Sequence, residues 1–271
     1  MSTTTFLING VPDAGVSPLD RGLAYGDGVF RTIRVVQGQP AAWAEHYAKL
    51  DDDSRRLKLL CPDAAAWQAD IARLFADQGD GVVKLVLTRG IAERGYAVAD
   101  RVSVTRIVIR SPLPSYPEQN ASAGIRAHLC NTRLAHQPLL AGIKHLNRLE
   151  NVLARQEWTD PGISEGIMLD QDGLVVEGVM SNILARSGTI LATPDLERCG
   201  VAGITRQRIL DIAPGLGLTP VITPLTLAEL MSADEVVMCN SLYGAWQVVD
   251  FNGRTWLAGQ LAGRLRQILQ E

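Results

Sequence analysis

The sequence predicts a two-domain protein of the α/β class whose N-terminal domain is of the α+β type. Strand patterns and helix patterns follow one another along all 271 residues, which is typical of mixed folds. The segment 111–117 holds three prolines, and prolines at this density cannot continue a helix or a central strand. We therefore place the domains at residues 1–113 and 118–271, joined by a linker at 114–117.

The N-terminal domain is expected to hold two helices and an antiparallel sheet. Residues 28–36 alternate between apolar and polar side chains, and Gln37-Gly38 suits a hairpin turn after them. Helices are predicted at 44–60, with Tyr47, Leu50, Leu57 and Leu60 on one face, and at 64–76, with Trp67, Ile71, Leu74 and Phe75. Strands are predicted at 6–10, 28–36, 82–88 and 103–109.

The C-terminal domain is expected to mix hairpins with helices. Glycine-containing turns at 171–173 and 187–188 separate short apolar runs, as in β-hairpins. The predicted strands are 124–130, 166–170, 174–177, 182–186, 189–192 and 235–240. The predicted helices are 147–158, 203–213 and 257–270.

Composition argues against several classes of function. A net charge of −3 gives no basic surface for nucleic acid, and no apolar run approaches the length of a membrane span. The first residues lack the basic and apolar regions of a signal peptide, so we expect a cytoplasmic protein with reduced cysteines. Neither a CxxC pair nor an HExxH motif occurs in the sequence, and we predict no metal site.

Lys144 is the most informative single residue. The chain has only four lysines, and this one follows an apolar stretch, 139–143, and precedes a polar run, 145–150. A desolvated amine beside cations such as His145 and Arg148 has a lowered pKa and is a better nucleophile. Such lysines form Schiff bases with carbonyl compounds, including pyridoxal phosphate. The alternative is a surface lysine that begins a helix.

Three further segments could bind a phosphorylated ligand. Gly203-Ile204-Thr205-Arg206 begins a predicted helix, whose free N–H groups and dipole favour anions, although an ordinary helix cap is the alternative. Asn240-Ser241 follows a strand and could contact the same phosphate. The run 22–28 is rich in glycine, which suits a tight loop or a close approach of backbone to a ligand.

Two other segments carry polar groups of possible interest. Glu177 ends an apolar strand and could either pair with a protonated pyridine nitrogen or face water. The pattern G-x-S-x-G at 162–166 lacks the preceding strand and following helix of a hydrolase elbow. We therefore expect Ser164 to lie in a loop and to have no catalytic role.

Taken together, these segments resemble the fold-type IV pyridoxal-phosphate enzymes, the class IV aminotransferase family. The resemblance extends from Asn9-Gly10 through Asp20-Arg21-Gly22 and the segment 25–30 to Asn240-Ser241. The family includes branched-chain aminotransferases, D-amino acid transaminases and aminodeoxychorismate lyases. Residues 144–150, Lys-His-Leu-Asn-Arg-Leu-Glu, are most similar to the lyases.

The resemblance implies a role for each matching residue. Lys144 would be the Schiff-base lysine and proton shuttle, and Glu177 would bind the pyridine nitrogen. The other implied cofactor residues are Ser181, Asn182, Ile204, Thr205, Asn240 and Ser241, the last four at the phosphate. The family has a phosphate-binding arginine where this sequence has Lys49, which keeps the charge but loses the bidentate fork. Nearby Arg55 or Arg56 could replace it.

The resemblance also implies an activity and an assembly. We expect two domains with the cofactor between them, a homodimer, and a small-molecule substrate. That substrate would be 4-amino-4-deoxychorismate, supplied by aminodeoxychorismate synthase and converted to 4-aminobenzoate and pyruvate for folate biosynthesis. Its carboxylates need cationic partners, and the candidates are Arg31, Arg94 and Arg106, with Tyr25 expected in the same pocket. The alternatives are a branched-chain or D-amino acid transaminase and a non-catalytic protein that binds a phosphorylated ligand.

Overall fold

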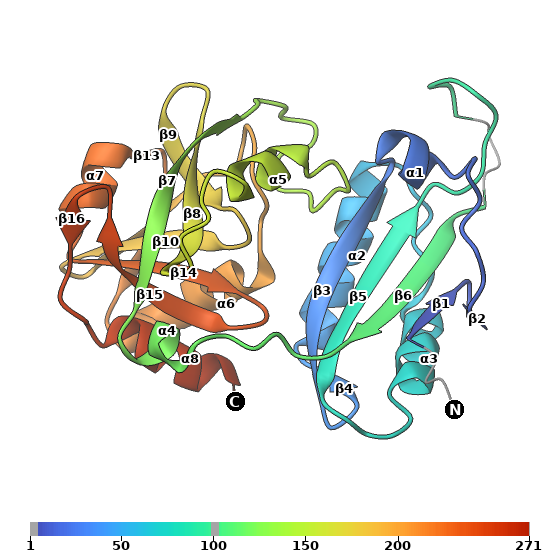
Figure 1. The fold of residues 1–271 in the computed structure, drawn as a ribbon, viewed down its shortest axis with the longest axis horizontal. Helices are drawn as coiled ribbons and strands as arrows, with labels where there is room; N and C mark the ends of the chain where they lie inside the picture. The colour runs from blue at the N-terminus through green and yellow to red at the C-terminus, as the bar shows by residue number, and fades with distance from the viewer. Residues whose placement is uncertain (1–4, 99–102, 271) are drawn as a thin grey trace. The chain divides into compact units, whose positions relative to one another are not determined.

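The computed structural model describes residues 5–98 and 103–270, which divide into two compact units (Figure 1). The N-terminal unit comprises the described part of Met1–Pro114 together with Lys144–Asn147, and the C-terminal unit comprises Ser115–Ile143 and the described part of Arg148–Glu271. Lys144 was expected in the C-terminal domain, so its grouping with the N-terminal unit is a correction. Residues 1–4, from which we argued against a signal peptide, lie outside the described residues.

The N-terminal unit is built on an antiparallel sheet with strand order β2-β1-β6-β5-β3-β4. Its antiparallel character was predicted. The strands are β1 (Phe6–Ile8), β2 (Val11–Pro12), β3 (Gly28–Val36), β4 (Gln39–Pro40), β5 (Gly81–Thr88) and β6 (Thr105–Ser111). The helices are α1 (Arg21–Tyr25), α2 (Trp43–Arg56) and α3 (Ala64–Leu74). Helix α2 packs against β3, and α3 packs against β6 and β1.

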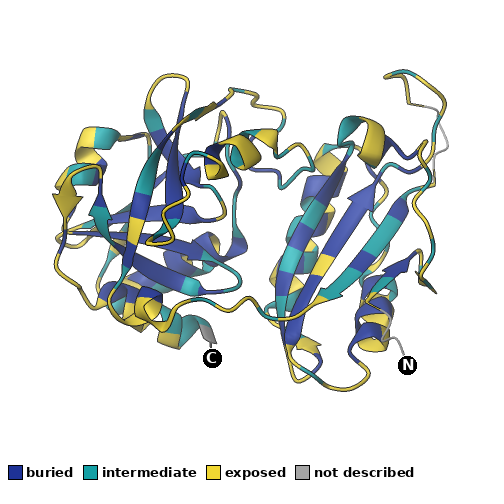
Figure 2. Cartoon of the chain, in the orientation of Figure 1, coloured by how far each residue is buried: buried dark blue, intermediate teal, exposed yellow. Residues whose placement is uncertain are grey.

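Strand β3 carries a charged residue on its buried face. Val29, Ile33 and Val35 are completely buried, since alternate residues of a strand face the same side. Arg31 belongs to the same row and is only 3% exposed, so its guanidinium is carried into the interior. Figure 2 shows buried and intermediate residues along most of β3. A buried charge needs a partner, and helix α2 supplies it.

Helix α2 buries Leu50 as predicted, but the residues buried beside it are not the apolar ones expected. The buried residues are His46, Leu50, Asp53 and Ser54, at helical spacing, whereas Leu60 lies beyond the helix and is 77% exposed. The prediction followed apolar residues, but this helix turns polar side chains inward. Asp53 is completely buried and faces the row that contains Arg31.

The C-terminal unit is built on a mixed sheet with strand order β12-β11-β10-β14-β15-β7-β8-β9-β13, with β16 beside β15. Pairs β11–β12, β15–β7 and β7–β8 are parallel, and the other pairs are antiparallel. The strands are β7 (Ile125–Leu134), β8 (Ile163–Asp170), β9 (Leu174–Gly178), β10 (Asn182–Ser187), β11 (Ile190–Pro194), β12 (Thr219–Thr223), β13 (Leu225–Thr226), β14 (Glu235–Asn240), β15 (Gly244–Phe251) and β16 (Arg254–Thr255).

Helices surround this sheet, and apolar side chains from several strands form its core. The helices are α4 (Glu118–Ser122), α5 (Leu149–Arg155), α6 (Ile204–Ile212), the 3-10 helix η1 (Ala213–Leu216), α7 (Leu227–Ser232) and α8 (Leu261–Gln270). One core cluster joins Ile167 of β8, Ile183 of β10 and Trp246 of β15. Strand β15, which the sequence analysis missed, is mostly buried and pairs with both β14 and β7. Within the described ranges, no helix combines the length and hydropathy that a membrane crossing requires.

Candidate functional site

The glycine-rich run 22–28 makes room for the segment Lys144–Asn147. Gly26 has a left-handed backbone (φ 66°), and a Cβ there would collide with the side chain of Asn147. A Cβ at Gly28 would collide with the carbonyl of Leu87 and the side chain of Leu146. The glycines at 26 and 28 therefore allow other parts of the chain to approach their backbone closely.

Lys144 is held through its main chain beside strand β3. Phe30 N donates to Lys144 O (2.9 Å), and Leu146 N donates to Gly28 O (3.0 Å). In the preceding peptide group, Lys144 N donates to Asp53 Oδ2 (3.1 Å). The Lys144 Nζ lies 4.8 Å from the centre of the Phe30 ring. The side chain thus projects from a backbone that is fixed on both sides, which argues against an ordinary surface lysine.

Asp53 also pairs with two cationic side chains. Arg31 Nη2 donates to Asp53 Oδ2, and Lys49 Nζ donates to Asp53 Oδ1. We call Arg31, Lys49, Asp53 and the main chain of Lys144 the Asp53 cluster. Burial lowers the pKa of the Lys49 ammonium, whereas Asp53 raises it. Burial likewise lowers the pKa of Arg31 against the opposing effect of Asp53. The alternatives to Lys49, Arg55 and Arg56, are both exposed at the end of α2.

Two of the expected substrate arginines have structural partners instead. Arg31 is buried in the Asp53 cluster, and Arg106 of β6 pairs with Asp70 of α3 at 2.7 Å. Each guanidinium neutralises an aspartate within the N-terminal unit. Arg94, by contrast, is exposed on a loop.

Tyr25 lies against the loop that carries Arg94. Its hydroxyl accepts a hydrogen bond from Gly95 N (3.2 Å), and its ring lies 5.3 Å from that of Tyr96. These two sequence-predicted residues, Tyr25 and Arg94, are therefore close neighbours in the N-terminal unit.

In the C-terminal unit, one loop connects Glu177 with the start of helix α6. Glu177 is 3% exposed, which excludes a water-facing carboxylate, and its Oε2 accepts from Val201 N (2.7 Å). Asn182 of β10 forms two hydrogen bonds with the same loop: its Nδ2 donates to Val201 O (2.8 Å), and its Oδ1 accepts from Gly203 N (3.1 Å). Gly203 is the N-cap residue of α6, and within the described residues it forms no side-chain hydrogen bond that caps this helix.

The start of α6 brings two hydroxyl groups together, as predicted. Thr205 Oγ1 and Ser241 Oγ are 3.1 Å apart, beside the first N–H groups of the helix. Ile204, at the first helical position, is 8% exposed. The side chain of Asn240 makes local hydrogen bonds: its Oδ1 accepts from Leu242 N and Tyr243 N, and its Nδ2 donates to Met180 O. It shapes the turn that presents Ser241. This arrangement of N–H and hydroxyl donors suits a phosphate group.

Glu165 is a buried carboxylate that the sequence analysis did not single out. It lies on β8 with no exposed surface, and Ser181 Oγ donates to its Oε2 (2.8 Å). The hydroxyl of Ser181, a residue expected at the cofactor, is thus bonded to this carboxylate. Ser164, expected in a loop, lies on β8 and is 3.3 Å from Asn120 Oδ1, which corrects that expectation. The G-x-S-x-G pattern points to Ser164, but the completely buried polar residue in this segment is the next one, Glu165.

Glu165 should make stability depend on pH. Burial raises the pKa of its carboxyl from 4.5 to about 7, although hydrogen bonds from Gly166 N and Ser181 lower it. Between pH 4.5 and about pH 7, Glu165 is protonated in the folded chain but ionised in the unfolded chain. The contribution of Glu165 to the free energy of unfolding is therefore complete below pH 4.5 and is lost as the pH rises through 7. The variant Glu165→Gln lacks this loss. Relative to the parent protein, it should gain on the order of 3 kcal/mol between pH 4.5 and 8.

Urea unfolding at pH 4.5 and pH 8 would measure this change. Glu118→Gln, at an exposed position on α4, is the matched control and should leave the pH dependence of the parent protein unchanged. Parallel pH profiles for the parent protein and Glu165→Gln would contradict the interpretation.

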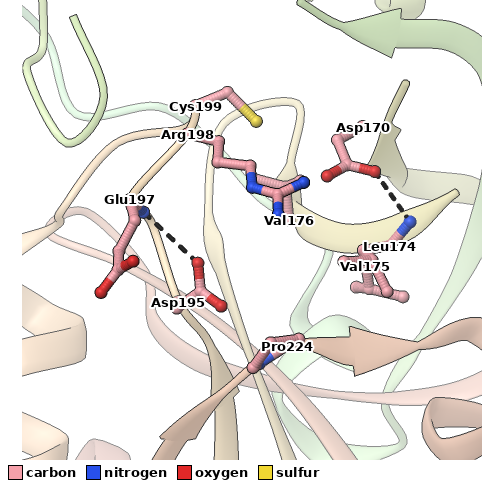
Figure 3. A pocket seen from close by; sticks show the side chains of 9 residues that line it. All are labelled: Asp170, Leu174, Val175, Val176, Asp195, Glu197, Arg198, Cys199 and Pro224. Carbon is pink, nitrogen blue, oxygen red and sulfur yellow. Dashed lines mark hydrogen bonds between the residues drawn. The ribbon is translucent and has the colours of Figure 1, made fainter. Parts of the chain in front are cut away.

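A cavity of about 140 Å³ in the C-terminal unit is lined by Leu174, Val175 and Val176 of β9 and by residues of the loop that follows β11 (Figure 3). Beside the cavity, His136, Asp170 and Cys199 bring possible metal-binding atoms within 4.8 Å of one another. A structural role accounts for this group: Asp170 Oδ1 caps the turn at Asp172 N and Leu174 N, and its Oδ2 contacts His136 Nε2 (2.9 Å). Burial and nearby carboxylates raise the pKa of the Cys199 thiol to about 12, which keeps it protonated.

Comparison with known proteins identifies the family of this chain. The model of the class IV amino-transferases matches residues 28–251. The chain is 32% identical to an aminodeoxychorismate lyase of Vibrio harveyi, over 88% of each chain. It is 32% identical to a putative branched-chain-amino-acid aminotransferase of Methanocaldococcus jannaschii, over 96% of this chain and 90% of that one. The crystal structure of 4-amino-4-deoxychorismate lyase from Pseudomonas aeruginosa superimposes with a TM-score of 0.94 and 48% identity, over 98% of each chain. The predicted fold class is thereby confirmed, and the chain belongs to the class IV aminotransferase family.

Proposed function

We propose that this chain is a pyridoxal-phosphate-dependent lyase that converts 4-amino-4-deoxychorismate to 4-aminobenzoate and pyruvate. The observation that carries the proposal is the 48% identity to the Pseudomonas aeruginosa lyase across 98% of both chains. The run Lys-His-Leu-Asn-Arg-Leu-Glu at 144–150 supports the same activity. We further propose that the enzyme works in the cytoplasm, in folate biosynthesis, as a homodimer supplied by aminodeoxychorismate synthase.

The cofactor of this family is pyridoxal 5'-phosphate, and the residues present suit it. The N–H groups at the start of α6 and the hydroxyls of Thr205 and Ser241 are donors for its phosphate. Glu177, buried and negatively charged when ionised, would hold the pyridine nitrogen in its protonated form. Lys144 Nζ would be the covalent attachment point. When bound, this cofactor supplies an electron sink for carbanion chemistry.

Lys144 would carry the protons of the reaction. In the proposed reaction, the Lys144 amine would remove the proton from the amine-bearing ring carbon of the substrate. The bond between the ring and the enolpyruvyl oxygen then breaks, and the ring becomes aromatic. The Lys144 ammonium donates its proton to the departing group, which leaves as pyruvate. The fixed main chain of Lys144 supports this role, since only the side chain needs to move between the two positions.

The substrate carries carboxylates, and we propose Arg94 for one of them. Its guanidinium is exposed, unlike those of Arg31 and Arg106, and arginine pairs well with carboxylate. Tyr25, which contacts the same loop, would shape the pocket at that point.

A product assay tests the proposal. Purified protein is supplied with aminodeoxychorismate made in place by its synthase, and 4-aminobenzoate is followed by fluorescence. Product that forms only when this protein is present supports the lyase. The second candidate is a transaminase, favoured by the 32% identity to the Methanocaldococcus jannaschii aminotransferase. Absence of 4-aminobenzoate, together with pyridoxamine phosphate accumulating from a branched-chain or D-amino acid, would replace the lyase with the transaminase.

Lys49 should serve the cofactor phosphate. Lys49→Ala should weaken binding of pyridoxal phosphate about tenfold, which corresponds to about 1.4 kcal/mol, yet leave binding of pyridoxal unchanged. Lys49→Arg should retain the affinity, since it restores a bidentate fork. Both affinities can be measured by absorbance titration of the cofactor-free protein. Lys58→Ala, at an exposed position beyond α2, is the control. Equal losses for the two aldehydes in Lys49→Ala would contradict a phosphate contact.

A further inference from the structure

We propose that Asp53 is a positioning residue for the cofactor: one buried carboxylate that orients Lys49 and fixes the main chain of Lys144. The inference rests on the proposed function, and it assigns a role to a residue that neither the family motifs nor the sequence patterns single out. All of its evidence lies within the N-terminal unit.

Asp53 has no exposed surface, so its charge depends entirely on protein partners. Its two oxygens receive donors from three separate parts of the unit: Arg31 of β3, Lys49 of α2 and the main-chain N–H of Lys144. A carboxylate in this position is costly unless each lone pair finds a donor. A purely apolar helix face could pack against β3, but it could not connect these three groups.

The contact with Lys144 is the more unusual one. Strand β3 bonds to the Lys144 carbonyl through Phe30 N, and Asp53 accepts from the Lys144 N–H. Each of the two peptide groups that flank the Lys144 Cα is therefore held by a hydrogen bond. Fixing the Cα of a reactive lysine limits the positions its Nζ can reach, which is how a supporting residue improves a reactive group.

The contact with Lys49 adds a charge argument. Arg31 and Lys49 share the one carboxylate of Asp53. Two cationic side chains held at one carboxylate suit a site for an anionic phosphate. Asp52, the neighbouring carboxylate, is 3.8 Å from Lys49 Nζ and 40% exposed, so it contributes far less.

The experiment compares two backgrounds, because removing Asp53 alone would leave buried cations and risk unfolding. Arg31→Leu keeps the pair between Asp53 and Lys49. The double variant Arg31→Leu with Asp53→Leu replaces the buried ion pair by apolar side chains. Each cofactor-free protein is titrated with pyridoxal phosphate and with pyridoxal, the adduct is reduced with borohydride, and the modified peptide is identified. Thermal unfolding of the same preparations reports stability.

We expect the double variant to melt within a few degrees of Arg31→Leu but to bind both aldehydes at least tenfold more weakly. Loss of both distinguishes Asp53 from Lys49, whose replacement should affect pyridoxal phosphate alone. Asp52→Asn is the matched control and should change neither affinity more than twofold. Equal affinities in the two backgrounds would overturn the proposal, as would a loss of affinity that only parallels a loss of melting temperature.

The same measurements separate this inference from the proposed function. If the parent protein forms its adduct on Lys144 but makes no 4-aminobenzoate, the lyase proposal fails, and the two titrations still decide the role of Asp53. If the parent protein forms no adduct on Lys144, both proposals are wrong.

Discussion

Replacing Lys144 by alanine should lower turnover at least about 10³-fold, the range expected when a general acid–base group is lost. The reason is chemical, because the bonds that hold this segment come from its main chain. Phe30 N, Gly28 O and Asp53 should keep their partners in the variant. The melting temperature of the cofactor-free protein should therefore change little. Borohydride reduction should no longer trap cofactor at this position, and 4-aminobenzoate formation measures the loss of activity.

Lys84 offers a matched control for Lys144. Its Nζ lies 5.0 Å from the centre of the same Phe30 ring, but its side chain projects from β5 and is exposed. Lys84→Ala should retain full activity and the reducible cofactor adduct. An active Lys144→Ala protein would refute the assignment of Lys144, and an inactive Lys84→Ala protein would show that the ring environment matters more than the lysine itself.

The second large effect is expected at Glu177. Glu177→Gln removes the negative charge opposite the pyridine nitrogen while keeping an acceptor for Val201 N. The nitrogen would then lose the partner that favours its protonated form, and the cofactor would be a weaker electron sink. We expect kcat to fall about a hundredfold, which corresponds to about 2.7 kcal/mol of transition-state stabilisation. KM should change much less, because the substrate does not contact this residue in our proposal.

Glu235→Gln provides a control of similar burial in the same unit. Glu235 is 8% exposed and pairs with Arg186 at 2.8 Å, at the start of β14. This variant should lose stability but keep its kcat. If Glu177→Gln lowers the melting temperature as much as Glu235→Gln and leaves kcat unchanged, Glu177 has only a structural role.

The sequence predicted the segments whose local pattern matches their environment. Strand 28–36 alternates as a half-buried strand should, and the structure forms β3 over that range. Thr205 and Ser241 were expected at one phosphate, and their hydroxyls lie 3.1 Å apart although 36 residues separate them. The helix N-terminus and the end of the strand each carry a local signal, and the resemblance to the family implied that both contact one phosphate.

The residues that were missed have roles set by distant partners. Asp53 appears in the sequence as one of three consecutive aspartates on a helix, and only its position opposite Arg31 distinguishes it. The predicted face of α2 followed Leu57 and Leu60, because polar residues at buried positions cannot be recognised until their partners are known. Glu165 was overlooked for the same reason: its buried location depends on strands β7 and β9 on either side of β8.

The grouping of Lys144–Asn147 with the N-terminal unit has a consequence for how the protein is made. The chain leaves that unit after Pro114, returns for four residues and leaves again. During synthesis, more than a hundred residues must therefore follow β3 before Phe30 N and Gly28 O can bond to Lys144 O and Leu146 N. A fragment that ends at the 114–117 linker would lack that edge and expose unpaired backbone, so we expect it to aggregate or to be degraded by proteases. We therefore expect that the N-terminal unit cannot be produced as an independent module from residues 1–114 alone.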